Sequence, residues 1–245
     1  MGNICCENTA NAGNITGTYP IKEMKFETVV GFQPNLSALV TDKLNEWGEG
    51  IWNVDDAESI HIDRSKHVKS IKMDPMKEPI KNFVYDGEWE LGQPDGLGKI
   101  YFSNGEYFEG EFRDGEAFGP GRYIFSDGST FVGNVENNKA RGEGKYISKE
   151  VTFEGFWEAS KPSVGTYTLT NGTKVELQSP HHGKIAFRNG DVYSGNISTE
   201  LHPTGEGVMQ FINGNTYEGD WRDGLMHGNG VFRWKNNGAE YDGNP

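Results

Sequence analysis

Cysteine, basic charge and long apolar runs are all scarce in this chain of 245 residues. The two cysteines are adjacent, at positions 5 and 6, so no disulfide is expected to cross-link the body of the protein, which fits a reducing compartment. No apolar run approaches the roughly 18 residues of a membrane-spanning helix. The N-terminus also lacks the basic start and apolar core of a signal peptide.

The charge is acidic, with a net value of −13. Nucleic-acid-binding proteins depend on basic patches, so we expect no nucleic-acid partner. The acidity lies mainly in residues 85–245, which carry 14 Lys/Arg and 24 Asp/Glu, a net charge of −10. Only 34% of the residues are hydrophobic and 34 are glycine, which argues against an ordinary two-layer core in this part.

What the chain does have is a repeated pair, an aromatic residue followed two places later by glycine. Successive pairs are 23, 23, 22, 40, 24 and 24 residues apart. A fixed period of this length indicates a repeat architecture, and the step of 40 is close to two periods. The pairs are Tyr85/Gly87, Phe108/Gly110, Phe131/Gly133, Phe153/Gly155, Tyr193/Gly195, Tyr217/Gly219 and Tyr241/Gly243.

Each repeat predicts a β-hairpin, because its two halves alternate with a period of two residues. Asp114-Gly115 and Asp223-Gly224 lie between such halves, and Asn-Gly or Asp-Gly pairs supply the positive φ angles that tight turns require. The expected fold is mainly β, an elongated, twisted, single-layer antiparallel sheet of about seven stacked hairpins with one aromatic face. The fifth unit, residues 175–187, lacks the aromatic residue and the usual turn, so we expect irregular pairing there.

The pattern Tyr-x-Gly-x-Trp followed by Gly-x-Gly, best formed at Tyr85–Gly98 and Tyr217–Gly230, resembles the MORN (membrane occupation and recognition nexus) repeat. The resemblance covers residues 85–245. It implies a β-sheet rod with scaffolding and protein-binding roles, frequent homodimerisation through terminal repeats, and occurrence in cilia, flagella and membrane-associated cytoskeletal structures.

Residues 1–6 (MGNICC) resemble an N-myristoylation signal at Gly2 with palmitoylation sites at Cys5 and Cys6. One myristoyl chain binds membranes only weakly, so stable anchoring needs a second signal. Residues 1–20 contain no Lys or Arg, which leaves the two thiols as that signal. We therefore expect residues 1–20 to be a flexible lipidated segment on the cytoplasmic face of a eukaryotic membrane, plasma, ciliary or internal. The alternative is an unmodified terminus.

Residues 21–84 are interpreted as a cap on the repeat array. Apolar residues at helical spacing predict a helix at 35–47, with Asn35 as its N-cap, packed on the first hairpins and covering an open sheet edge. Residues 64–81 hold six Lys/Arg and two Asp/Glu. This basic stretch is either a solvated linker, a segment lying on the acidic repeats, or a contact with an anionic leaflet.

Motifs for chemistry are missing. His181-His182 has no further ligand at metal-binding spacing, and no phosphate-binding loop, calcium loop or nucleophile motif is present. We expect no enzyme, no cofactor and no metal.

The sequence therefore predicts a membrane-tethered scaffold or adaptor that binds a basic or amphipathic segment of a protein partner along the aromatic face. The alternatives are a structural component of a ciliary, flagellar or cytoskeletal assembly, as in the radial spoke, and a phosphoinositide-binding module. The unfinished hairpin at 241–243 further suggests a homodimer near the C-terminus. The candidate partner-binding residues are Trp89, Tyr107, Tyr123, Trp157, Tyr193, Tyr217, Trp221 and Trp234.

Overall fold

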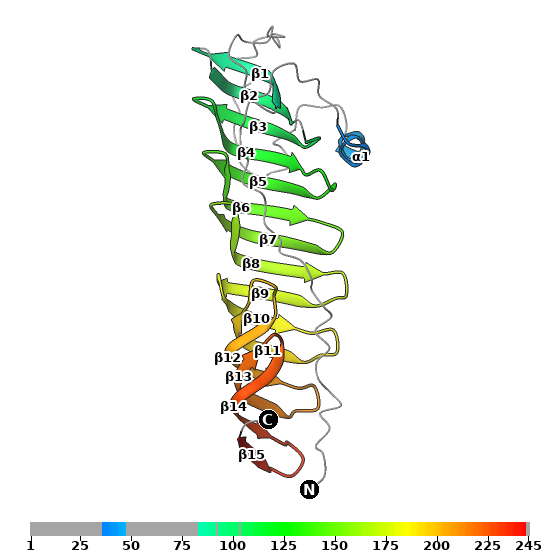
Figure 1. The fold of residues 1–245 in the computed structure, drawn as a ribbon, viewed down its shortest axis with the longest axis vertical. Coiled ribbons are helices and arrows are strands. Elements are labelled where there is room, and N and C mark those ends of the chain that lie inside the picture. The colour runs from blue at the N-terminus through cyan, green and yellow to red at the C-terminus, as the bar shows by residue number, and fades with distance from the viewer. Residues whose placement is uncertain (1–35, 48–82, 92, 103, 244–245) are drawn as a thin grey trace. The chain divides into compact units, whose positions relative to one another are not determined.

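The computed structural model describes residues 36–47, 83–91, 93–102 and 104–243. Within these ranges it contains one helix, α1 (Ala38–Trp47), and 15 strands that pair in chain order in a single antiparallel sheet (Figure 1). The predicted mainly β fold with a short N-terminal helix is therefore confirmed. The acylation signal and the basic stretch lie outside the described residues. The strands are β1 (Phe83–Glu90), β2 (Gln93–Phe102), β3 (Tyr107–Arg113), β4 (Glu116–Ile124), β5 (Thr130–Glu136), β6 (Lys139–Ile147), β7 (Val151–Glu158), β8 (Lys161–Leu169), β9 (Lys174–Ser179), β10 (His182–Ala186), β11 (Val192–Ile197), β12 (Pro203–Gln210), β13 (Thr216–Arg222), β14 (Leu225–Arg233) and β15 (Glu240–Gly243).

The described residues fall into two compact units, which we treat separately. The N-terminal unit holds α1, the strands β1 to β6, and residues 157–161. The C-terminal unit holds residues 150–156 and the chain from residue 162 onward.

Two-residue turns close the hairpins where the sequence predicts them. Asp114 and Gly115 have φ angles of 51° and 84°, and Asp223 and Gly224 have 51° and 80°. Positive φ at both positions is the geometry that matches the twist of the flanking strands. Ala159 and Ser160 take the same conformation, with φ of 47° and 62°, although neither residue favours it.

The two glycines of each Gly-x-Gly have different functions. The first, as at Gly96 and Gly228, has a positive φ in a bulge of the second strand. An acidic side chain on the first strand holds this bulge, since Asp220 accepts a hydrogen bond from the Asn229 N–H at 2.9 Å. The second glycine leaves room for an aromatic ring: a Cβ added to Gly121 would lie 2.6 Å from two ring carbons of Phe108.

These rings and glycines share one side of the sheet, which we call the aromatic face; the opposite side is the outer face. In the N-terminal unit the glycines pair with one another from strand to strand, beside a row of large side chains. The glycine row is Gly87, Gly98, Gly110, Gly121, Gly133 and Gly144, and the large residues are Tyr85, Ile100, Phe108, Tyr123, Phe131 and Tyr146.

The degenerate fifth unit keeps this arrangement with other residues. Val175 stands in the row of large side chains, and Leu177 stands in the glycine row between Gly165 and Gly183. Both are buried. A smaller residue at the ring position and a larger one at the glycine position fill comparable space, so strand pairing continues through this unit. The predicted irregularity is present as a register shift between His182 and Gly183.

Helix α1 lies within the predicted range but differs from the prediction in two ways. Ser37, rather than Asn35, caps it: the Ser37 hydroxyl accepts a hydrogen bond from the Val40 N–H at 3.2 Å. The helix also packs on the outer face rather than covering an edge strand. Its buried Val40 contacts Tyr107 on β3 and Ile124 on β4.

Candidate protein-binding surface

Most of the predicted partner-binding aromatics on the aromatic face are buried by the sheet itself. The indole N–H of Trp157 donates to the Gly144 carbonyl at 3.0 Å, and that of Trp221 donates to Gly207 at 3.1 Å. The Tyr193 hydroxyl donates to the Asn196 carbonyl at 2.8 Å. Their polar ends are thus satisfied within the sheet: Trp157 and Trp221 each bond a glycine carbonyl of the preceding hairpin, and Tyr193 bonds a carbonyl of its own strand and covers Gly207 of its own hairpin.

Tyr217 follows the same pattern, with its hydroxyl donating to the Asp220 carbonyl at 3.2 Å. It is buried and lies edge to face with Trp221, with ring centroids 5.3 Å apart. Burial raises the pKa of Tyr193 to about 12 and also raises the pKa of Tyr217. These hydroxyls therefore stay neutral and serve the packing of the sheet.

Tyr107 points to the outer face, not to the aromatic face on which partner contact was predicted. Its hydroxyl donates to Glu109, whose carboxylate also pairs with Arg122. The Arg122 guanidinium lies over the ring of Trp47 on α1, at 4.3 Å from its centre. Burial, and then the Glu109 charge, raise the pKa of Tyr107, so the network holds a neutral phenol beside an ion pair under the helix.

Tyr123 is buried on the aromatic face and donates from its hydroxyl to the Glu106 carboxylate at 2.5 Å. Glu106 is itself buried in the loop between β2 and β3. Burial and then the Glu106 charge raise the pKa of Tyr123. Of the two remaining candidates, the Trp89 side chain lies outside the described part of the chain, and Trp234 is partly exposed.

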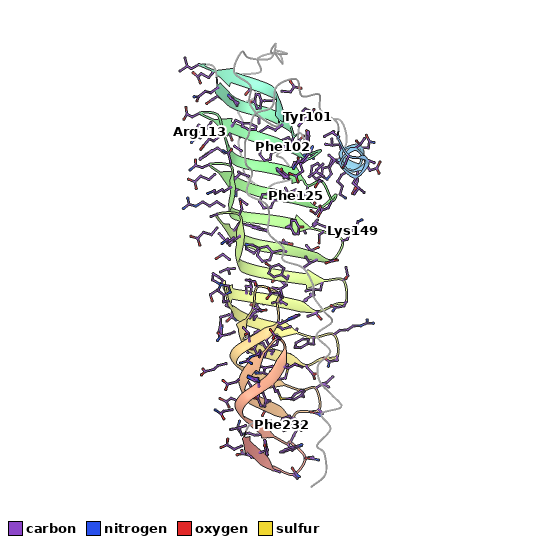
Figure 2. All side chains as sticks on the ribbon, in the orientation of Figure 1. Tyr101, Phe102, Arg113, Phe125, Lys149 and Phe232 are labelled. Atoms are coloured by element: carbon purple, nitrogen blue, oxygen red, sulfur yellow. The ribbon has the colours of Figure 1, made fainter. Side chains whose placement is uncertain are left out.

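Trp234 belongs to a group of aromatic residues at β12 to β15 that are less buried than their equivalents. Phe232 contacts Trp234 with ring centroids 4.6 Å apart and Phe211 at 5.7 Å, and it pairs across the strands with Tyr241. Tyr241 is 42% exposed, whereas Tyr193 and Met209 in the same row are buried. We call Phe211, Phe232, Trp234 and Tyr241 the C-terminal aromatic cluster; Figure 2 labels Phe232.

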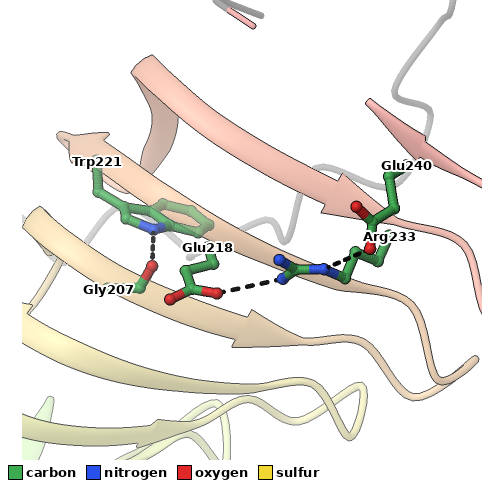
Figure 3. Close-up of polar contacts among 5 residues, drawn as sticks. All are labelled: Gly207, Glu218, Trp221, Arg233 and Glu240. Carbon is green, nitrogen blue, oxygen red and sulfur yellow. Dashed lines mark hydrogen bonds and ion pairs between the residues drawn. The ribbon is translucent and has the colours of Figure 1, made fainter. Parts of the chain in front are cut away.

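The outer face behind this cluster is polar. Arg233 pairs with Glu218 at 3.2 Å and with Glu240 at 3.0 Å, which links β13, β14 and β15 (Figure 3). The hydrogen bonds that Arg233 donates to these two carboxylates raise its pKa. The pairs are exposed, so their effect on stability is small. The two faces at this end thus differ sharply, one aromatic and one carrying charge.

Two kinds of site are absent from the described part of the chain. The described residues contain no group of three His, Cys, Asp or Glu side chains placed to hold a metal ion. Within the same ranges, no helix has the length and apolar character needed to cross a bilayer.

The residues that sequence reasoning missed are Phe211 and Arg122. Phe211 precedes an Asn-Gly turn and was not singled out, although Trp234 occupies the equivalent position. Arg122 lies opposite Glu109 once Gly110 is aligned with Gly121, so the ion pair could have been predicted from the repeat register.

No curated protein sequence has a significant match to this chain. Among solved structures, the chain is similar to the SAS-4 (dCPAP) TCP domain of Drosophila melanogaster in complex with a proline-rich motif of Ana2 (dSTIL). The sequence identity is 15%, the TM-score is 0.36, and the match covers 64% of this chain and 90% of that one. The E1021V mutant of the TCP10 domain of Danio rerio CPAP matches at 14% identity and a TM-score of 0.37, over 62% of this chain and 77% of that one. No function is transferred from similarities at this level.

The repeat pattern is matched directly by a family model. MORN repeats are detected at residues 85–107, 108–130, 131–149, 202–216 and 217–239. The three N-terminal matches begin at Tyr85, Phe108 and Phe131, the ring positions of successive hairpins, and the last begins at Tyr217. The five matched segments lie in the strands β1 to β6 and β12 to β14.

Proposed function

We propose that this protein is a non-enzymatic scaffold, tethered to a membrane by N-terminal acyl chains, that binds a protein partner through the C-terminal aromatic cluster. The main support for this binding site is the difference in side-chain exposure along the aromatic face. The rings of Tyr193, Tyr217 and Trp221 are buried in the sheet, whereas Phe211 and Trp234 are partly exposed and Tyr241 is 42% exposed. Tyr and Trp supply much of the binding energy at protein interfaces.

The chemistry of the surroundings favours a basic or amphipathic segment as the partner. The cluster borders β15, where Glu240 and Asp242 are exposed, and residues 85–245 carry a net charge of −10. A positively charged segment would be drawn to such a surface and oriented by it, while the rings would supply the apolar contact.

The test is the double substitution Phe211→Ala with Trp234→Ala in the full chain. Proteins that co-purify with the wild type are compared by quantitative mass spectrometry with those that co-purify with the variant. Ile212→Ser is the matched control, since Ile212 is 74% exposed and follows Phe211. We expect at least one partner to fall more than tenfold with the double variant and to persist with the control. An unchanged set of partners would refute the binding site.

The membrane tether rests on Gly2, Cys5 and Cys6. Gly2→Ala blocks myristoylation, and Cys5→Ser with Cys6→Ser removes both palmitoylation sites. Because one acyl chain gives only marginal binding, each change alone is expected to release the protein from membranes. Fractionation of the three proteins tests this. Equal behaviour of all three would show that the N-terminus is not an anchor, and a detergent-resistant pellet in each case would favour a cytoskeletal component instead.

A further inference from the structure

The outer face of the N-terminal unit shows how this sheet receives a helix. Beneath α1, an apolar row (Tyr101, Tyr107, Ile124) contacts Val40, Leu44 and Trp47. A charged row lies beside it, where Glu109 pairs with Arg122 and Arg122 stacks on Trp47. Helix α1 therefore packs on a row of apolar side chains. The neighbouring row provides the charged, planar guanidinium group that stacks on the helix.

Both rows continue past the footprint of α1 onto the next hairpin. In strand register, Ile124 is followed by Thr130 on β5 and Ile147 on β6. In the second row, Arg122 is followed by Val132 on β5 and Lys145 on β6. Here the apolar residues are uncovered: Ile147 is 44% exposed and Val132 is 36% exposed.

Helix α1 itself forms one wall of this uncovered surface. Its Leu39 is 45% exposed and rests on the turn between β4 and β5, where a Cβ added to Gly128 would lie 3.4 Å from the Leu39 Cβ. Gly128 lies two residues before Thr130, the cross-strand partner of Ile147. Leu39, Val132 and Ile147 are thus three exposed apolar side chains around Thr130 on this side of α1, and we call the surface they form the helix-side ledge.

We propose that the helix-side ledge is a second docking surface, separate from the C-terminal aromatic cluster, and that its occupant is an amphipathic α-helix of a partner protein lying beside α1. The width fits: two strands span about 10 Å, which matches the diameter of one helix and the usual 8–10 Å between packed helix axes. The ledge is continuous with the interface that already holds α1.

The test uses a defined probe and the full-length protein. The probe is a labelled helical peptide of about 14 residues with leucine at i, i+3, i+4 and i+7 and with Glu and Gln elsewhere. Its binding is measured by fluorescence anisotropy to the wild type and to the double variant Val132→Asp with Ile147→Asp. We expect saturable binding to the wild type and at least tenfold weaker binding to the variant. Both residues are exposed strand positions, so circular dichroism should show the variant folded.

Ile212→Asp is the matched control, because it places the same charge on an exposed isoleucine of the C-terminal unit. It should leave peptide binding unchanged, as should Trp234→Ala, which separates this proposal from the proposed function. No binding to the wild type, or equal binding to the Val132/Ile147 variant, overturns the proposal. Binding to phosphatidylcholine vesicles is measured in parallel. If the Val132/Ile147 variant loses vesicle binding but keeps peptide binding, the ledge contacts lipid and the proposal is also overturned.

Discussion

The packing of each ring over a glycine makes a quantitative prediction for Phe108 and Gly121. A Cβ on Gly121 would lie 2.6 Å from the Cε2 and Cζ atoms of the Phe108 ring, and its next neighbour is the Glu109 carbonyl oxygen at 3.3 Å. Gly121→Ala should therefore lower the free energy of unfolding by about 1–3 kcal/mol through overpacking. Phe108→Leu alone should cost about 1–2 kcal/mol, because it removes buried ring atoms and leaves a cavity over Gly121.

The two changes together should cost less than their sum. Leucine lacks the two ring atoms that meet the new methyl group, so the overlap disappears, and alanine in a strand is favoured over glycine by about 0.5–1 kcal/mol. We expect a favourable coupling of about 1–2 kcal/mol in the double-mutant cycle.

Gly133 and Phe131 provide a contrasting cycle in the same unit. A Cβ on Gly133 would lie 2.5 Å from the Gly144 Cα and 2.7 Å from the Glu143 carbonyl oxygen, and both of these are backbone atoms. The Phe131 Cζ atom at 2.9 Å is a third contact that Phe131→Leu would relieve, but the overlap with the backbone would remain, so this cycle should show weaker coupling than the Phe108/Gly121 cycle.

Urea denaturation followed by circular dichroism measures both cycles, with hydrogen exchange at β4 and β6 as a local check. Equal coupling in the two cycles, or none in the Phe108/Gly121 cycle, would refute the view that the ring alone dictates glycine at position 121.

Three further predictions concern single sites. Ala159→Asn should increase the free energy of unfolding by about 0.5–1 kcal/mol and raise the melting temperature, because asparagine tolerates the positive φ of 47° at this turn position. Calorimetry measures the change, and a lower melting temperature would contradict the turn assignment. Asp191→Ala should lower the free energy of unfolding by about 1–3 kcal/mol, because the buried Asp191 carboxylate accepts hydrogen bonds from the Ile212 N–H at 2.8 Å and from Asn189 at 2.7 Å. Urea denaturation measures this, and no change would mean that these bonds do not contribute to stability. Burial raises the pKa of Tyr193 from 10.0 to about 12, so its neutral form stabilises the fold fully below pH 10, and this contribution is lost as the pH rises toward 12. Tyr193→Phe should flatten the fall in stability across that window, and an unaltered pH profile would count against the shift.

The hairpins could be predicted from the sequence because their signals are local. Asp114-Gly115 and Asp223-Gly224 determine their turns through their own φ preferences, and period-two alternation assigns each residue to a face. The exchange of Val175 and Leu177 into the ring and glycine rows could not be predicted in the same way. It depends on strand pairing with Gly165 and Gly183, and no residue pattern within the degenerate unit indicates that pairing.

The predicted site was harder to derive, because alternation assigns a face but does not tell whether that face is covered. Tyr193 and Trp221 are aromatic residues on the expected face, yet glycines and carbonyl groups of their own or neighbouring strands enclose them. Tyr107 is predicted to contact a partner on the aromatic face, but its neighbour Phe108 occupies that face, so the period-two alternation places Tyr107 on the outer face. The contact between α1 and the sheet brings together Val40, Tyr107 and Ile124, which are far apart in the chain, so no local pattern predicts it.

In the proposed function one chain connects a protein partner to a membrane, so the partner should change its location together with this protein. The measurement is the membrane-bound fraction of a partner that requires Phe211 and Trp234, in cells that express either the wild type or Gly2→Ala. We predict that with Gly2→Ala the partner still co-purifies with this protein but leaves the membrane fraction together with it. A partner that stays on membranes in equal amount while Gly2→Ala is soluble would contradict the claim.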